Sequence, residues 1–197
     1  MNYNEVMKNI IKELDGHNKL LLHSCCAPCS SSVIERLRKD FKITVLYYNP
    51  NIEPEAEYLK RKSEQIRFLT AVNIPYEEID YANEDFRKIV KGYEAEPENG
   101  LRCRECYQLR LQKTSELALK NGYDYFGTTL TVSPHKNSQL INELGMAIQA
   151  SSGVKYLASD FKKEAGYKRS IELAKEHQLY RQDYCGCLYS KGRDNEE

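Results

Sequence analysis

Seven cysteines are the residues of this chain whose types and spacing point most directly to chemistry. They form three tight groups, which are Cys25, Cys26 and Cys29, then Cys103 and Cys106, then Cys185 and Cys187. The first two groups each contain a C-x-x-C spacing, which lets the chain curl back and direct two sulfurs to one metal. Because seven is odd, intramolecular disulfides cannot pair all of them.

Several interpretations of the cysteines are open from spacing alone. A structural zinc site would use four thiolates. Those four would most simply be Cys103, Cys106, Cys185 and Cys187. A thiol-redox site would use Cys26 and Cys29 at the start of a helix, but would leave the later cysteines unexplained. An iron–sulfur cluster also takes four thiolates, and inert buried thiols are the remaining possibility.

The adjacent pair Cys25 and Cys26 favours a site richer than one tetrahedral zinc. Neighbouring side chains of an extended segment point to opposite sides of the chain. Two neighbouring thiolates can therefore serve two metal centres that lie side by side.

Composition indicates one soluble globular domain over residues 1–197. The chain of 22.9 kDa is 41% hydrophobic and 29% charged, with a mean hydropathy of -0.69. Its 29 basic and 29 acidic residues cancel, which excludes a uniformly basic nucleic-acid binder but leaves a local basic face open. We find no signal-peptide core and no apolar run that would span a bilayer. We therefore expect a cytoplasmic protein without a membrane partner, with reduced thiols.

The hydrophobic pattern alternates strands with helices, which predicts an α/β fold with a mostly parallel, five-stranded, Rossmann-like sheet flanked by helices. Strands are expected at 19–23, 42–48, 74–79, 125–129 and 154–157. Helices are expected at 3–15, 28–41, 55–72, 83–91, 103–121, 138–151 and 167–176, followed by a cysteine-bearing C-terminal tail. Ligands of such sheets bind beyond the carboxyl ends of the strands, where Cys25 and Cys26 are expected.

Five blocks of sequence resemble the QueH-type epoxyqueuosine reductases. They are HSCCAPC at 23–29, CRECYQLRL at 103–111, TTLTVSPHKN at 128–137, DFKKEAGYKRS at 160–170 and YRQDYCGC at 180–187. One C-x-x-C motif alone is unspecific, whereas these five blocks in this order are highly specific. They extend from about residue 20 to 190, and the resemblance therefore covers nearly the whole chain.

The resemblance implies reduction of epoxyqueuosine to queuosine at the wobble position of tRNA, the last step of queuosine biosynthesis, without cobalamin. It also implies a fold similar to the adenine nucleotide alpha-hydrolases, a [4Fe-4S] cluster beside a second iron ion, and an external electron donor. All seven cysteines would be metal ligands. The expected division gives Cys26, Cys103, Cys106 and Cys185 to the cluster, and Cys25, Cys29 and Cys187 to the second iron. The alternative function is a non-catalytic, zinc-stabilised RNA-binding module.

Supporting residues follow from the same reaction. Proton transfer to the departing oxygen is assigned to His135, Asp183 and Tyr184, with His23 and Tyr107 as further candidates. Contacts with tRNA phosphates are assigned to Lys162, Lys163, Lys168 and Arg169. Arg102, Arg104 and Arg110 flank the second cysteine pair and could reach phosphate or the modified base.

We expect no use of ATP. Related α/β folds that adenylate their substrates bind ATP phosphates with a glycine-containing S-G-G-x-D-S-type loop after the first strand. The corresponding segment at 24–30 contains no glycine.

Overall fold

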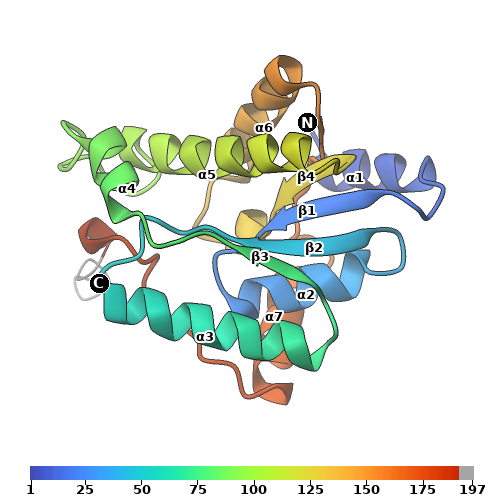
Figure 1. Ribbon diagram of the computed structural model, residues 1–197, viewed down its shortest axis with the longest axis horizontal. Coiled ribbons are helices and arrows are strands. Elements are labelled where there is room, and N and C mark those ends of the chain that lie inside the picture. Colours follow the sequence, from blue (N-terminus) through green and yellow to red (C-terminus); the bar gives the residue numbers. More distant parts are fainter. Residues whose placement is uncertain (191–197) are drawn as a thin grey trace.

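A five-stranded sheet lies at the centre of the chain, which the computed structural model describes over residues 1–190 (Figure 1). The strands are β1 (Lys19–His23), β2 (Lys42–Tyr47), β3 (Tyr76–Glu78), β4 (Tyr125–Thr128) and β5 (Lys155–Tyr156). Their order is β3-β2-β1-β4-β5, and every neighbouring pair is parallel. The predicted fold class is confirmed, and the sheet is wholly rather than mostly parallel.

Helices cover both faces of this sheet, as parallel sheets require. The helices are α1 (Tyr3–Lys12), α2 (Ala27–Leu37), α3 (Glu55–Ala71), α4 (Asn83–Val90), α5 (Leu101–Lys120), α6 (Ser138–Ser152) and α7 (Gly166–Glu176). Two short 3₁₀ helices are η1 (Thr129–Val132) and η2 (Leu188–Ser190). Figure 1 shows α5 and α6 on one side of the sheet and α2, α3 and α7 on the other. None of the described helices is long and apolar enough to cross a membrane.

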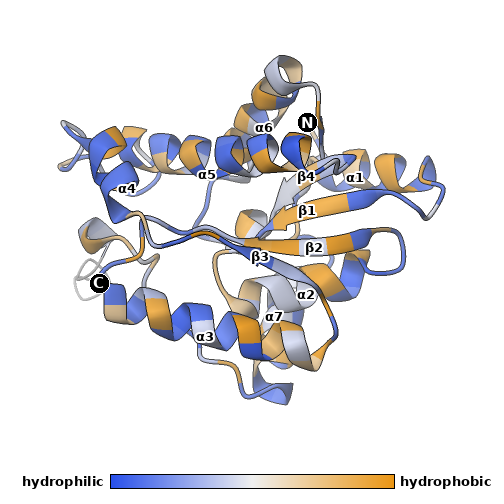
Figure 2. Cartoon of the chain, viewed as in Figure 1, coloured by the Kyte–Doolittle hydropathy of each residue, from blue (hydrophilic) through white to orange (hydrophobic). Residues whose placement is uncertain are grey.

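Alternation along β1 distributes its leucines between two hydrophobic cores. Leu20 and Leu22 pack in the core beneath α2 and α7, whereas Leu21 packs in the core beneath α5 and α6. Both faces of the strand are buried, and its three central residues are therefore all leucine (Figure 2). This double burial produces the short apolar run seen in the sequence.

The strand order places a ligand-binding crevice between β1 and β4. From β1 the chain proceeds to β2 and β3 on one side of the sheet and to β4 and β5 on the other. The loops that leave the carboxyl ends of β1 and β4 therefore diverge and leave room between them. Cys25 follows β1, and η1 follows β4, at this point.

Several predicted elements were longer than the observed ones, among them the last strand, which covers only Lys155–Tyr156. Three of the differences have a clear local reason. The edge strand β3 covers only Tyr76–Glu78, because it pairs with β2 alone and follows Pro75, which has no N–H to donate. The helix α2 ends at Leu37, and Phe41 packs in the core from the following turn. The helix α1 ends at Lys12, ahead of Gly16, whose φ is +79°.

Candidate metal centre

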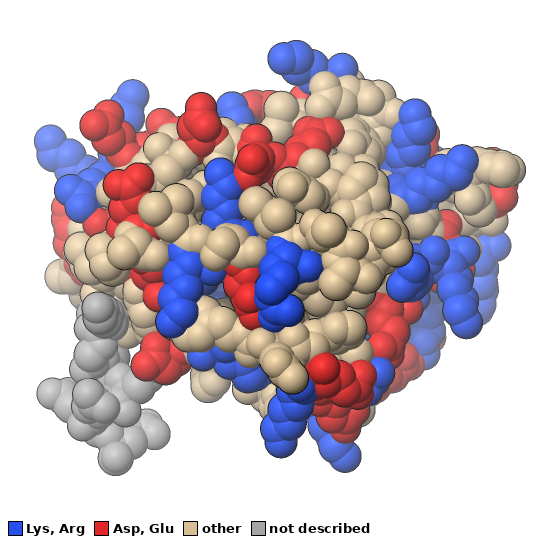
Figure 3. All heavy atoms as spheres, turned by 60° about the horizontal axis from the view of Figure 1, so that its bottom comes forward, with Lys and Arg blue, Asp and Glu red and all other residues tan. Residues whose placement is uncertain are grey.

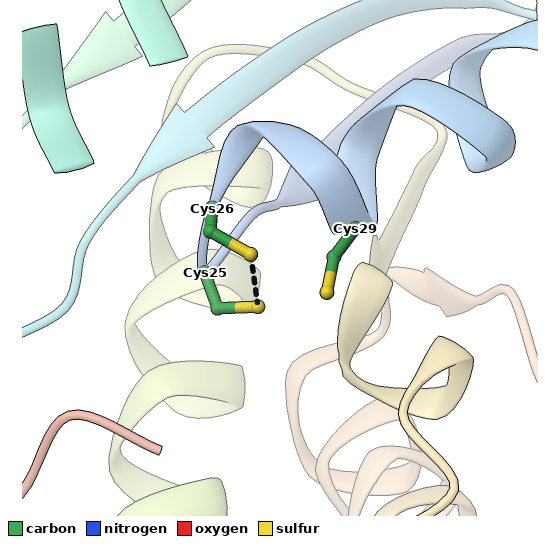
Figure 4. A group of neighbouring side chains, drawn as sticks. All are labelled: Cys25, Cys26 and Cys29. Atoms are coloured by element: carbon green, nitrogen blue, oxygen red, sulfur yellow. Dashed lines mark hydrogen bonds between the residues drawn. The ribbon is translucent and has the colours of Figure 1, made fainter. Parts of the chain in front are cut away.

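Cys25, Cys26 and Cys29 place three sulfurs at the carboxyl end of β1. All three sulfur atoms lie within 4.8 Å of one another, and the Cys25 and Cys26 Sγ atoms are 3.7 Å apart (Figure 4). Cys26 is buried, and the other two are partly buried. Three soft donors this close together could share one metal ion or neighbouring metals.

The triad favours a thiolate at Cys25. Hydrogen bonds from Cys26 and Cys29 hold the pKa of the Cys25 thiol well below its usual range, and the charge of Lys136 lowers it further. The same hydrogen bond raises the pKa of Cys26 to about 12, and the pKa of Cys29 also lies well above its usual range. Of the three thiols, Cys25 therefore gives up its proton most readily.

A buried polar network shapes the loop that carries the triad. The hydroxyl of Ser24 donates to Gln65 Oε1 on α3 at 2.9 Å, and the Ser24 carbonyl accepts from the amide of Asn49 at 2.8 Å. Cys26 is the N-terminal cap of α2, whose first turn contains Pro28. The positive end of the helix therefore faces the sulfurs and favours negative charge there.

The second cysteine pair lies on the first turns of α5. The backbone N–H of Asn99 donates to Cys103 Sγ at 3.3 Å. Cys106 packs with Cys187, Phe86 and Val90 in a small apolar cluster. Burial raises the pKa of Cys106 to about 12, and the charges of Cys185, Cys187 and Cys103 act in the same direction. These four cysteines therefore lie within electrostatic range of one another.

Arg61 on α3 holds the cysteine-bearing tail in place. Its guanidinium donates to the carbonyls of Cys185 and Tyr184, each at 3.3 Å, and to Glu57 at 2.7 Å. Gly186 has a φ of +122°, and a Cβ there would lie 2.9 Å from Ile52 Cγ1. The spacing Cys185-Gly-Cys187 therefore depends on the glycine for this close approach.

A cavity of about 260 Å³ brings the first and third cysteine groups and the expected catalytic residues to one place. Cys25, Cys29 and Cys185 line it. The three residues assigned to proton transfer, His135, Asp183 and Tyr184, line it as well.

These catalytic candidates differ in their exposure and in whether they already form a hydrogen bond. His135 and Asp183 are exposed. The hydroxyl of Tyr184 already donates to the Glu53 carbonyl at 2.7 Å. The hydroxyl of Tyr107 donates to Asn99 Oδ1 at 3.4 Å.

His23 is a structural residue. It is fully buried between Thr128 Oγ1, at 2.9 Å from Nδ1, and the Tyr48 carbonyl, at 3.0 Å from Nε2. Burial, aided by the charge of Arg110, lowers its pKa to about 3. The ring is therefore neutral near pH 7 and bonded at both nitrogens.

The basic residues expected to bind RNA are not equivalent. Arg169 is ion-paired with Glu35, Glu172 and Glu176, and Lys162 lies 3.4 Å from Asp160. Lys163 and Lys168 are exposed and form no ion pair within residues 1–190. Figure 3 shows basic and acidic side chains interspersed on the face it presents, rather than one basic field.

The arginines that flank the second cysteine pair also divide. Arg104 is exposed, whereas Arg102 and Arg110 are both 1% exposed. Arg102 donates to the carbonyls of Glu94 and Glu96. The expectation that Arg102 reaches RNA phosphate is wrong, because its guanidinium is enclosed within the protein.

Sequence reasoning missed several residues of the cavity. Gln182 donates from Nε2 to Cys26 Sγ at 2.9 Å, and Lys136, Arg61, Arg181 and Glu98 also line the wall. Lys136 adjoins His135 in one of the five sequence blocks, and Gln182 adjoins Asp183 in another. The blocks could therefore have identified these two. Arg61 lies on α3 outside every block, and only the fold brings it to the cysteines.

A parallel α/β sheet with seven free thiols, three of them mutually adjacent beside a cavity at the switch point, defines a Rossmann-like protein with a thiol-rich candidate metal centre. The sequence model of a family described as "Epoxyqueuosine reductase QueH" matches residues 20–193. The chain belongs to this family, and the expected resemblance is confirmed.

Curated relatives agree with this membership. The epoxyqueuosine reductase QueH of Staphylococcus epidermidis is 47% identical, over 96% of this chain and 84% of the relative. The protein of the same name from Staphylococcus aureus is 44% identical, with the same coverage. That of Thermotoga maritima is 37% identical, over 87% of this chain and 89% of the relative.

Proposed function

We propose that this protein is an oxidoreductase that reduces epoxyqueuosine to queuosine at the wobble position of tRNA, the last step of queuosine biosynthesis. The observation that carries the proposal is the triad of adjacent thiols beside the cavity, in a chain that belongs to the QueH family. The reaction converts one epoxide, two electrons and two protons into one alkene and one water.

A [4Fe-4S] cluster with an adjacent iron ion is the proposed cofactor. Seven thiols with no disulfide between them offer the soft donors that both centres take. When bound, the cofactor supplies single electrons and a Lewis-acidic iron that polarises the epoxide C–O bond.

The seven cysteines can be divided between the cluster and the adjacent iron in two ways. The division expected from the resemblance puts Cys26 with the second and third cysteine groups. The closeness of its sulfur to those of Cys25 and Cys29 supports a division in which these three residues share a centre.

Two protons must reach the departing oxygen. His135 and Asp183 are the proposed carriers, because both line the cavity and are exposed to water that can reprotonate them. Tyr184 would contribute only after its hydroxyl leaves the Glu53 carbonyl, and we propose for it a role in orienting the substrate.

The proposed macromolecular partner is tRNA that carries epoxyqueuosine. Lys163 and Lys168 would contact phosphates directly, whereas Lys162 and Arg169 would first have to leave their carboxylate partners. The proposal also includes a cytoplasmic location, an external electron donor, and no requirement for cobalamin or ATP.

Anaerobic reconstitution tests the proposal directly. The protein is loaded with iron and sulfide, its metal content is measured, and epoxyqueuosine-tRNA is supplied with dithionite. We expect iron-dependent absorption near roughly 400 nm and conversion of epoxyqueuosine to queuosine, detected by mass spectrometry of the digested RNA. Cys25→Ser and Cys185→Ser should lose iron and product, whereas a Ser63→Ala control, on the exposed face of α3, should keep both.

The same experiment separates the alternative function. A colourless preparation that holds only zinc, binds tRNA and forms no queuosine would identify a zinc-stabilised RNA-binding module. Full activity with zinc and no iron would contradict the proposed cofactor but not the proposed substrate.

A further inference from the structure

Three cations face the cysteines without a carboxylate partner. Arg102 and Arg110 are buried, and Lys136 is partly buried in the cavity wall. Within residues 1–190, no Asp or Glu oxygen lies within ion-pair distance of any of them. By contrast Arg61, at 2% exposed, has Glu57 at 2.7 Å.

Arg110 has few polar partners other than the cysteines. Its Nε donates to the Cys106 carbonyl at 3.2 Å, one turn earlier on the same helix, and its buried Nη2 has no hydrogen-bond partner. Burial lowers its pKa, but the negative charges of Cys106, Cys185 and Cys25 outweigh burial and raise it. The groups that balance Arg110 are therefore sulfurs.

Lys136 and Arg102 show the same relationship on other sides of the site. Burial lowers the pKa of Lys136, and the charges of Cys185 and Cys25 more than reverse this. The charge of Arg102 opposes the rise that burial causes in the pKa of Cys103 and Cys187. The three cations together therefore reach members of all three cysteine groups.

Unpaired buried charge strongly destabilises a fold, whereas a buried charge with a partner does not. Around neutral thiols the three cations would have no counter-charge. A metal–thiolate centre is net negative when its thiolates carry more negative charge than the metal carries positive charge. Such a centre would supply the missing counter-charge. The inert-thiol interpretation of the cysteines therefore conflicts with the charges that surround them.

We propose that Arg102, Arg110 and Lys136 are the fixed counter-charges of an anionic metal–thiolate centre, and that they make its reduction more favourable. This inference rests on the proposed metal centre. Reduction adds one negative charge to the centre, and a cation nearby in a medium of low dielectric constant stabilises that charge. The three side chains act on the charge of the metal centre and do not contact the substrate.

The reduction potential of the metal centre in Lys136 variants tests the inference. Lys136 is partly exposed, and its substitution should therefore disturb folding less than substitution of the buried Arg102 or Arg110. In the reconstituted protein, Lys136→Met should disfavour reduction by about tenfold, which is about 59 mV for a one-electron couple. Lys136→Arg keeps the charge and should restore the potential. Lys120→Met is the matched control, because it removes an exposed lysine ten residues beyond Arg110, about 15 Å along α5. An unchanged potential in Lys136→Met overturns the inference.

Thermal unfolding of Arg110→Met gives a second measurement that needs no enzymatic activity. If Arg110 balances the metal–thiolate centre, the rise in Tm on metal loading should be smaller in the variant than in the parent protein. A purely structural arginine would lower Tm equally with and without metal, and this equal shift would refute the counter-charge role.

The zinc-loaded protein distinguishes the two proposals. Absence of iron and of epoxide reduction would end the proposed function, but the smaller Tm gain on zinc binding would still support the counter-charges. If the iron-loaded enzyme is active but neither its reduction potential nor its gain in Tm changes in the two variants, the proposed function holds and the counter-charge inference is refuted.

Discussion

The guanidinium of Arg61 and the main-chain carbonyl of Cys185 are 3.3 Å apart, although 124 positions separate them in sequence. A second hydrogen bond reaches the carbonyl of Tyr184, and the Tyr184 ring lies 4.9 Å from the guanidinium carbon. The third cysteine group has no helix or strand of its own between α7 and η2. Its position at the cavity therefore depends on the Arg61 side chain of α3 together with Glu53, whose N–H donates to the Gly186 carbonyl at 2.8 Å.

Arg61→Met should release the tail. The substitution removes both carbonyl contacts and leaves Glu57, which is 13% exposed, with the Tyr180 hydroxyl but no cation. Because the pair is only partly buried, the cost should lie below the roughly 3–5 kcal/mol of a fully buried pair. We expect a lower free energy of unfolding in urea and a lower metal content after reconstitution.

Arg67→Met provides the matched control on the same helix. Arg67 also pairs with a glutamate and donates to two carbonyls, but it is 51% exposed and contacts His177 and Gln178 instead of the cysteines. The loss should stay within about 1 kcal/mol, with normal metal content. Equal metal loss in both variants would show that Arg61 has no specific role at the tail.

Gly186→Ala should disturb the site more than an ordinary glycine substitution. The new Cβ would lie 2.9 Å from Ile52 and 3.2 Å from Arg61 Nη1, in addition to the strain of a positive φ. Gly153→Ala tests strain alone, because Gly153 has a φ of +79° and open space around it, and about 1 kcal/mol is expected there. Urea unfolding and metal analysis of both variants should show the larger loss, and all of the metal loss, at Gly186.

His23 should make the fold sensitive to acid. Its pKa is about 3 in the folded protein, whereas the ordinary value is 6.5. Between these values the unfolded chain binds one more proton, and the free energy of unfolding therefore falls as pH falls, by about 1.4 kcal/mol per pH unit. In His23→Gln this contribution disappears, and urea titrations from pH 6.5 to 4 should give a shallower decline. Parallel declines for the two proteins would contradict a neutral buried His23.

RNA binding should depend on Lys168 but not on Arg169. Loss of one phosphate contact lowers the slope of log affinity against log salt concentration by about one. Lys168→Met should show this reduced slope with epoxyqueuosine-tRNA. Arg169→Met should keep the slope and lower Tm instead, because its guanidinium is held by Glu35, Glu172 and Glu176. A reduced slope in Arg169→Met would show that this network opens to bind RNA.

Local pattern was sufficient for the elements of the fold. The apolar run of β1 identified a doubly buried strand, and the alternation of strands with helices predicted the parallel sheet, because both depend on periodicities that span only a few residues. Errors occurred at the ends of elements, as in the helices α1 and α2 and in the edge strand β3, which pairs on one side only. The cysteine spacing likewise identified the candidate ligands from sequence.

Only the tertiary structure decided what surrounds these cysteines. Side chains from α3, α5 and the loop before α6 lie beside the sulfurs. The distances between these residues along the sequence do not predict that they are neighbours in space. Burial likewise distinguished Arg102 from the exposed Arg104 two residues later, and ion pairing distinguished Arg169 from the exposed Lys168 beside it. Residue type determines which charges and donors are available, whereas packing determines which of them lose water and therefore act on one another.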